Sequence, residues 1–218
     1  HAFAEATLED GAVWYGVLFV ALMLGLLWLL GGVRPTIALL ACVGAACALA
    51  LGAGTWFGIV LTTPSAVAPL VIVTVGIAHG VHLLLGYAHA RDDGHDPVGA
   101  WHQSVRENVG PVFWTSVTTA AASLSLRYSE VPPFRDLGTI TAVGVLAAGV
   151  LGITLLPALM AILPGPDPRP RIRRVWLGAL HRAVLRRPGP ALAVGLVLLA
   201  AMTAGVARIR LNDDFVAY

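Results

Sequence analysis

Six long apolar stretches, separated by short charged or proline-containing segments, constrain what this chain can fold into. They cover residues 12–31, 36–61, 64–88, 108–126, 134–163 and 189–207. A helix needs about twenty apolar residues to cross the hydrocarbon of a bilayer. With 57% hydrophobic and only 12% charged residues, the chain has too few polar side chains to cover a soluble surface. The sequence therefore predicts an all-α, polytopic integral membrane bundle of about six transmembrane helices.

The stretch 108–126 differs from the others because it is rich in hydroxyl side chains, as in PVFWTSVTTAAASLSL. Ser and Thr in a membrane helix bond back to their own carbonyls or across to a neighbouring helix. We expect this stretch to pack inside the bundle. The pairs Gly144/Ala148 and Gly149/Gly152 in the next stretch also suit close helix packing.

The arginines predict how the chain is oriented, because cytoplasmic loops carry an excess of basic residues. One set of connecting segments holds Arg34, then Arg91 and Arg106, then the run from Arg169 to Arg187, in a loop (164–189) with seven arginines and one acid. The opposite side begins with acidic residues at Glu5, Glu9 and Asp10. This distribution predicts that both chain ends lie outside the cytoplasm.

The segment between the third and fourth stretches, DPVGAWHQSVRENVGP, has its own apolar spacing. Val98, Trp101 and Val105 recur at three- and four-residue intervals, which is typical of a helix with one apolar face. The pattern fits an amphipathic helix lying on the cytoplasmic face of the membrane, and it fits a solvated connector helix equally well.

Three segments carry a family resemblance: GIAHGVHLLLGY (76–87), NVGPVFWTSVTTAAASLSL (108–126) and FRDLGTITAVGVLAAGVLGITLLPALMAIL (134–163). In order, spacing and topology they resemble the membrane domain of the resistance–nodulation–division (RND) superfamily. The branch that they resemble most is the MMPL or predicted-exporter group, which is related to Patched, Dispatched and the sterol-sensing domain. The resemblance extends over roughly residues 12–163, and the TSVTT run and the final LLPALM are its most specific parts.

The resemblance implies a fragment of a two-repeat permease in the bacterial inner (cytoplasmic) membrane, running from its second to its seventh helix. The implied domains are 1–11 as the end of a first extracytoplasmic domain and 12–163 as a five-helix transmembrane bundle. A basic cytoplasmic loop (164–188), the first helix of the second repeat (189–207) and the start of a second extracytoplasmic domain (208–218) follow. We expect the chain to begin and end within a longer protein.

Two histidines, His79 and His82, lie inside the third apolar stretch. In the family the corresponding helix reads Gly-x-x-Asp-x-x-His or similar, and the Asp is the proton-relay carboxylate. By that resemblance GIAHGVH places His79 at the Asp position and His82 at the family His, so this sequence departs from the pattern. An ionisable group in the bilayer is costly and usually functional, and histidine can gain a proton in the physiological pH range.

Three hypotheses for His79 stay open at the level of sequence. It is a working proton carrier; or it is a neutral residue bonded to a facing Thr such as Thr115, Thr118 or Thr119; or it forms a metal site with His82. Residues at i and i+3 share a helix face, but no third ligand is evident in the spans. The hydroxyls of the TSVTT run either line a path for water and protons or only satisfy their own backbone. We predict no cofactor and no metal, and the candidate relay residues are His79, His82, Thr115, Ser116, Thr118 and Thr119.

The resemblance implies a transporter: an RND-type exporter of lipids or other hydrophobic molecules, driven by protons. The alternative is a non-transporting lipid-binding or sensing membrane module of the sterol-sensing-domain type. An enzyme is not expected, because no Asp pair, HExxH or Gly-x-Ser-x-Gly motif lies in a span. Expected partners are the bilayer, a hydrophobic or lipid substrate, protons, and further copies of the chain or accessory periplasmic proteins. Nucleic acid is not expected, because the arginine run beside a span is explained by anionic lipid and topology.

Overall fold

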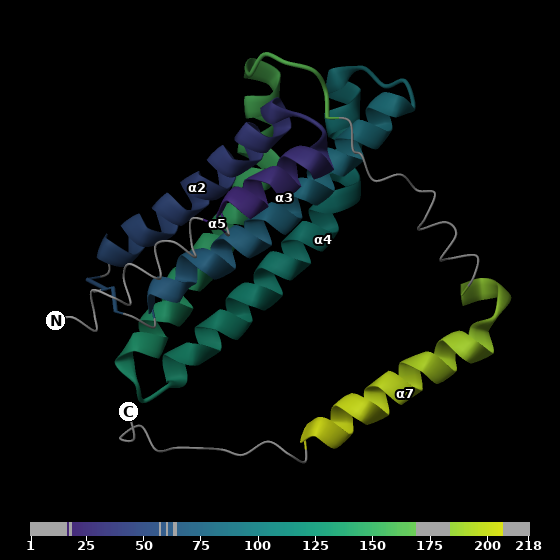
Figure 1. Cartoon of the computed structure of the whole chain (residues 1–218). Helices are drawn as coiled ribbons and strands as arrows, with labels where there is room; N and C mark the ends of the chain where they lie inside the picture. Colours follow the sequence, from purple (N-terminus) through teal and green to yellow (C-terminus); the bar gives the residue numbers. More distant parts are fainter. Residues whose placement is uncertain are drawn as a thin grey trace. The chain divides into compact units, whose positions relative to one another are not determined.

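The computed structural model describes residues 17, 19–56, 58–59, 61–62, 65–168 and 184–206. No strand occurs among these residues, and the all-α prediction is confirmed. The elements are a helix Phe19–Leu30, α2 (Val33–Trp56), the 3₁₀ turn η1 (Ser65–Val67), α3 (Ala68–Asp92), α4 (Pro97–Ser125), the 3₁₀ turn η2 (Leu126–Tyr128), α5 (Pro132–Ile162) and α7 (Pro188–Val206) (Figure 1).

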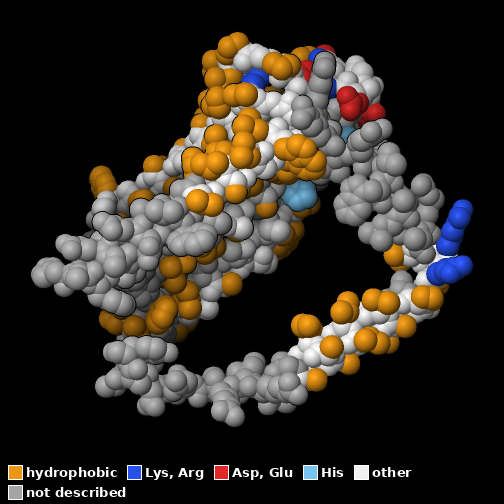
Figure 2. Space-filling model, viewed as in Figure 1, with side chains coloured by type: hydrophobic (Ala, Val, Ile, Leu, Met, Phe, Trp, Pro, Cys, Tyr) orange, Lys and Arg blue, Asp and Glu red, His pale blue; other side chains and the backbone are white. Residues whose placement is uncertain are grey.

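The chain divides into two compact units, residues 1–171 and 172–218. The second unit contains α7, a 19-residue helix preceded by Arg186 and Arg187. Figure 2 shows apolar side chains along the whole of this helix. A helix that is apolar all round needs lipid or other helices around it, in agreement with the predicted span 189–207.

The first unit is a bundle in which α3 and α5 form the central pair (Figure 1). Each of these two helices packs against both α2 and α4, whereas the described residues of α2 and α4 make no contact with each other. The two outer helices therefore lie on opposite sides of the α3–α5 pair. Fully buried side chains fill the space between the helices, among them Leu39, Leu83, Ile72 and Leu156.

Local sequence signals set the ends of these helices. Gly94 adopts a positive φ of 93° just after α3, and the N–H groups of Gly94 and His95 bond the carbonyls of Arg91 and Ala90. This is the glycine-terminated Schellman arrangement. Asp96 then caps the next helix by accepting a bond from the Gly99 N–H (3.2 Å), and Pro97 occupies the first turn.

Three helical segments are long and apolar enough to cross a membrane by length and composition: Val33–Trp56, Ser65–Asp92 and Pro132–Ile162. The described parts of two further predicted spans are shorter apolar helices, Phe19–Leu30 and Pro188–Ala204. The remaining predicted span, 108–126, lies largely in α4, which is not among these apolar helices. Figure 2 shows apolar side chains over much of the bundle surface, with acidic and basic side chains near one end. Such a surface is suited to lipid rather than water.

The segment 97–107 differs from both sequence-based interpretations. It is neither a separate helix on the membrane surface nor a solvated connector, because α4 runs without interruption from Pro97 to Ser125. Its first half is packed on α3: Ala100 and Ser104 are buried, and the Ser104 hydroxyl donates to the Leu83 carbonyl (2.6 Å). Of the three residues in the apolar spacing, Trp101 and Val105 pack half-buried against the core of the bundle, whereas Val98 is exposed.

Gly144 of α5 lies where three helices meet. A Cβ built on it would collide with the Ile72 side chain of α3 and lie 3.0 Å from the Ala50 Cβ of α2. Gly138, two turns earlier, is tighter still, because its Cβ would overlap the backbone carbonyl of Ser123 at the end of α4. Glycine at these positions lets α5 approach its neighbours closely.

We predict that Gly144→Ala destabilises the bundle by about 1–3 kcal/mol, because overpacking forces neighbouring side chains to move. The measurement is the unfolding of the detergent-solubilised protein under increasing denaturant. Gly52→Ala on α2 is the matched control, because a Cβ added at Gly52 would have no atom of the described residues within 4 Å. The control should leave stability unchanged or slightly raised, since alanine favours a helix. Equal losses from both substitutions would contradict the close-packing explanation.

Candidate functional site

His79 lies in the middle of α3 and is buried, with 5% of its surface exposed. Its Nε2 atom is 2.8 Å from the Thr115 hydroxyl oxygen on α4. The contact joins two helices in the apolar part of the chain, where water is scarce and polar groups need partners within the protein. Among the hydroxyls of the TSVTT run, Thr115 is the residue that meets the histidine.

The Thr115 hydroxyl has one hydrogen and three neighbouring acceptors. Besides His79 Nε2, its oxygen lies 2.8 Å from the Pro111 carbonyl and 3.1 Å from the Val112 carbonyl of its own helix. If the hydroxyl donates to Pro111, the ring must donate through Nε2–H, and Nδ1 carries the lone pair. If the hydroxyl donates to Nε2, the proton sits on Nδ1. The contact thus allows two tautomers of His79.

The second ring nitrogen, Nδ1, is buried and has no hydrogen-bond partner among the described residues. The hydroxyls of Ser116 on α4 and Thr141 on α5 share this property, with 4% and 3% of their surfaces exposed. Unpaired buried polar groups are rare and costly, so each calls for a water, an ion or a function. Ser116 also faces Gly149 of α5, where a Cβ would lie 2.5 Å from the hydroxyl oxygen.

The remaining predicted site residues lie apart from this contact. His82 is exposed on α3, and Thr118 is exposed on α4, where its hydroxyl bonds the Trp114 carbonyl (2.8 Å). Thr119 is half-buried. The residues that the structure describes contain no cluster of three His, Cys, Asp or Glu side chains suited to a metal. The structure therefore joins the side chains of His79 and Thr115, whereas Thr118 reaches only the Thr115 backbone carbonyl (3.3 Å), and no hydrogen bond joins His82 or Thr119 to either residue.

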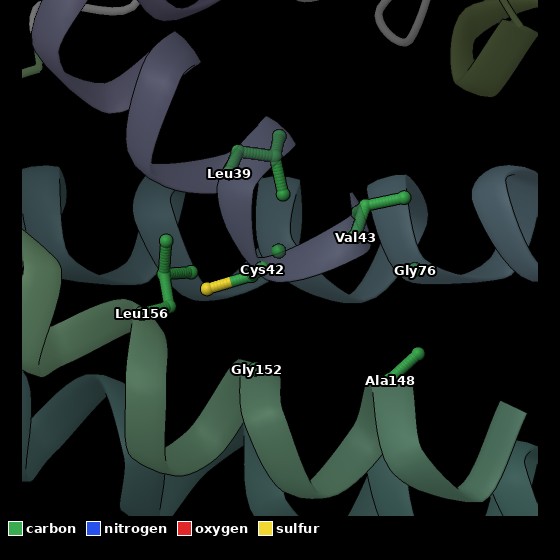
Figure 3. Close-up of a pocket in the computed structure, with 8 residues that line it drawn as sticks. Leu39, Cys42, Val43, Gly76, Ala148, Gly152 and Leu156 are labelled. Atoms are coloured by element: carbon green, nitrogen blue, oxygen red, sulfur yellow. The ribbon is translucent and has the colours of Figure 1, made fainter. Parts of the chain in front are cut away.

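A small apolar cavity lies between α2, α3 and α5, lined by Leu39, Cys42, Val43, Gly76, Gly80, Ala148, Gly152 and Leu156 (Figure 3). Its volume is about 10 Å³, which is the room of one water molecule. The cavity is too small for a lipid or other transported molecule. It shows instead that α3 meets α2 and α5 through small residues.

A second polar cluster lies at one end of the bundle. The Asp167 carboxylate, in the segment after α5, accepts hydrogen bonds from the Tyr87 hydroxyl (2.9 Å) and from Arg91 Nε (2.9 Å), both on α3. Arg34, in the first turn of α2, is 3.4 Å from the same carboxylate. The sequence signal for this cluster is that Asp167 is the one acid beside the arginine run, but no spacing rule connects it to Arg34 or Tyr87.

Burial by itself would raise the pKa of the Asp167 carboxyl. The hydrogen bonds from Arg91 and Tyr87 and the charges of Arg91 and Arg34 outweigh that effect and hold the pKa below its ordinary value of 3.8. A lowered pKa means that the carboxylate stabilises the fold above pH 3.8, and that this contribution is lost as the pH falls through the folded-state pKa. Asp167 is therefore ionised throughout the neutral pH range.

Comparison of the sequence with those of known proteins identifies a family. The MMPL family model matches residues 2–203 of the chain. The chain is 27% identical over 172 residues to the probable transport protein MmpL9 of Mycobacterium tuberculosis. It is 30% identical over 156 residues to the siderophore exporter MmpL5 of the same organism, and 26% identical over 162 residues to the hopanoid transporter HpnN of Rhodopseudomonas palustris. The resemblance to the RND superfamily and its MMPL branch is thereby confirmed.

The matches cover most of this chain but little of the relatives. They include 78%, 66% and 72% of the chain, and only 17%, 16% and 18% of the three relatives. The chain thus spans less than a fifth of the length of each of these three curated relatives. All three relatives carry the names of transporters or exporters.

We predict that Thr115→Val destabilises the bundle by about 1–3 kcal/mol, because both nitrogens of the buried His79 ring then lack a partner. Thr115→Ser keeps the hydroxyl and should restore most of the loss. The measurement is the free energy of unfolding of each purified variant.

Thr118→Val is the control on the same helix, because Thr118 is exposed and bonds only to its own helix backbone. Its effect should stay within about 0.5 kcal/mol. If Thr115→Val were as mild as this control, the contact between Thr115 and His79 would not stabilise the bundle.

Proposed function

The chain belongs to the MMPL family, and from that premise we propose that it forms part of the membrane domain of an RND-type exporter of lipids or other hydrophobic molecules. The observation that carries the proposal is His79: a buried ionisable side chain in a membrane-spanning helix, bonded across to α4 and with one ring nitrogen unpaired among the described residues. Such residues are costly in a bilayer, and they mark ion and substrate pathways.

We propose that export is driven by protons and that His79 takes up and releases one of them. In the tautomer that donates from Nε2–H to Thr115, the Nδ1 atom has a free lone pair and accepts the proton. The protonated ring carries a positive charge, whereas the Asp that usually stands at this position in the family becomes neutral on protonation. No carboxylate occurs in the apolar stretches 64–88 and 108–126 that hold the contact. The compensating negative charge would come from the remainder of the full-length transporter.

The class of substrate rests on the relatives and on the surroundings of the bundle. A siderophore exporter and a hopanoid transporter are among the proteins that the chain resembles. The exposed surface of the described helices is strongly apolar, as expected for a protein that works within lipid. The proposed partners are the bilayer, a hydrophobic or lipid substrate and protons, together with further copies of the protein or accessory periplasmic proteins.

The proposed location is the bacterial inner membrane, with both ends of the chain outside the cytoplasm. The contacts around Asp167 support this orientation, since they gather Arg34 and Arg91, which the sequence places on one side, at a single end of the bundle. This topology implies a division of the chain into five parts. They are an extracytoplasmic segment (1–11), a bundle (12–163), a basic loop (164–188), a further helix (189–207) and a second extracytoplasmic segment (208–218).

A lipid-binding or sensing module that does not transport is the second candidate function. The absence of a carboxylate beside His79 in the described helices favours it, because a neutral histidine bonded to Thr115 needs no proton cycle. The two functions differ in whether His79 has to change its protonation state. That difference can be tested directly in cells.

We predict that His79→Ala abolishes export by the full-length protein, because the substituted side chain cannot carry a proton. Strains that lack the gene are complemented with the parent or the variant at equal expression. Mass spectrometry of solvent extracts then compares the hydrophobic molecules retained by the cells with those in the medium. The variant should match the empty vector, and a protonophore should produce the same accumulation in cells that carry the parent.

His102→Gln serves as the control, because His102 is exposed in the first half of α4, away from the apolar part of the bundle. It should export like the parent. Full export by His79→Ala would rule out the proton-carrier role. Export that persists in the parent in the presence of the protonophore would rule out the proton-driven mechanism.

A further inference from the structure

The Asp167 cluster ties three parts of the bundle together at one end. The carboxylate receives two hydrogen bonds from α3, through Tyr87 and Arg91, and an ion pair from Arg34 of α2. Asp167 itself follows α5 in a segment without regular structure. A single side chain thereby joins the last turns of α3 to the start of α2 and to the exit of α5.

The α2 side of this connection does not depend on Asp167. Arg34 also donates to the Met160 carbonyl in the last turn of α5 and to the Gly165 carbonyl (2.7 Å). The end of a helix leaves its carbonyls unpaired and slightly negative, which suits an arginine. Gly165 has a positive φ of 138°, and a Cβ there would lie 3.2 Å from the Arg34 side chain. Arg34 therefore keeps α2 joined to α5 whether or not Asp167 is engaged.

The connection from α3 is different, because Arg91 has another acceptor besides Asp167. The Arg91 guanidinium donates to the His95 carbonyl as well as to Asp167, and the charge of Asp96 at the start of α4 acts on it. Arg91 and Asp167 are about one-third exposed, so water reaches the pair. If Asp167 is released, Arg91 is not left as an unpaired buried charge, which would be the costly outcome. The bond to the His95 carbonyl would remain to Arg91 after such a release.

Along the rest of α3, two glycines face side chains of α2. A Cβ on Gly76 would lie 3.1 Å from Val43, and one on Gly80 would collide with Leu39. The cavity in Figure 3 lies at this contact. Glycine surfaces allow helices to approach closely without interlocking side chains of their own. At the end of α3, the polar contacts of Tyr87 and Arg91 add to this apolar packing in fixing the position of α3 relative to α2.

We propose that Asp167 is an ionic latch that holds the Arg91 end of α3 against α2 and the exit of α5, and that α3 moves away from this end when the latch opens. The charged and titratable groups that face the carboxylate are Arg34 from α2 and Tyr87 and Arg91 from α3. Because Asp167 stays ionised at neutral pH, the latch opens by displacement of Arg91 and Tyr87 and not by protonation. The link to transport rests on the proposed function: α3 also carries His79, so one helix connects the latch to the proposed relay.

The test measures the distance between α2 and α3 in the full-length protein in lipid nanodiscs. Nitroxide labels are attached to cysteines at the exposed positions Val33 and His89, near the start of α2 and the end of α3, in a background without other cysteines. Double electron–electron resonance spectroscopy then measures the distribution of distances between the two labels. Asp167→Asn should add a population longer by about 5 Å, the pitch of one helical turn, which is a known step for packed helices. Asp167→Glu should keep the distribution of the parent.

Two further variants separate the latch from a general loss of structure. Tyr87→Phe removes one hydrogen bond to Asp167 but keeps the ring that stacks on Trp101, with centroids 4.6 Å apart, and it should give a smaller long-distance population. Asp93→Asn removes an exposed negative charge at the same end and should change nothing. Distributions for Asp167→Asn and Tyr87→Phe that superimpose on the parent would overturn the latch, as would an equal shift in Asp93→Asn. Since these distances need no transport, a latch that opens alongside full export by His79→Ala would refute the proposed relay alone.

Discussion

Every polar group inside this bundle has to find its partner within the protein, because hydrocarbon offers none. The helices meet this demand for their own backbones. Most of the threonines also meet it locally: Thr36, Thr74, Thr139 and Thr154 each donate to the carbonyl four residues earlier. Local satisfaction leaves few polar groups free to join one helix to another. The contacts that do cross between helices therefore stand out as specific: His79 with Thr115, Ser104 with Leu83, Arg34 with Met160, and Asp167 with α2 and α3.

Close packing and polar contact act together in the central pair of helices. Gly144 and Gly149 let α5 approach α3 and α4, and Gly76 and Gly80 do the same for α3 against α2. Without a strong hydrophobic drive between helices in lipid, such small-residue contacts supply much of the association. Between α3 and α4, Gly86 allows a similar approach, because a Cβ there would lie 2.7 Å from the Ser104 hydroxyl oxygen. The His79–Thr115 contact joins the same two helices, and the second nitrogen of His79 has no partner among the described residues.

The contacts of His79 and of Asp167 lie at different places along α3, the first near its middle and the second at its end. At the centre, His79 lies among apolar side chains, and a change in its charge would be costly unless something compensates it. At the end, Asp167 is partly exposed and ionised at neutral pH, and it joins Arg34 of α2 to Tyr87 and Arg91 of α3. Both contacts involve α3, whose buried residues include Gly76 and Gly80 as well as the larger Ile72 and Leu83. Between the two contacts, the Ser104 hydroxyl of α4 donates to the Leu83 carbonyl of α3. The latch proposed above concerns only the end of α3 beyond this point.

The sequence by itself determined the helical class, the approximate positions of the apolar spans, the family and the two histidines as the unusual residues of the third span. These features can be predicted from local properties of the sequence: hydropathy over twenty residues, glycine and proline at helix ends, and the order of motifs. The tertiary structure decided what each side chain meets. It selected Thr115 rather than Thr118 or Thr119 as the partner of His79, made 97–125 one helix, and joined Asp167 to Arg34, 133 residues away in the chain. Such choices depend on the rotation of each helix and on the distance between helix axes, and no local pattern of residues specifies either one.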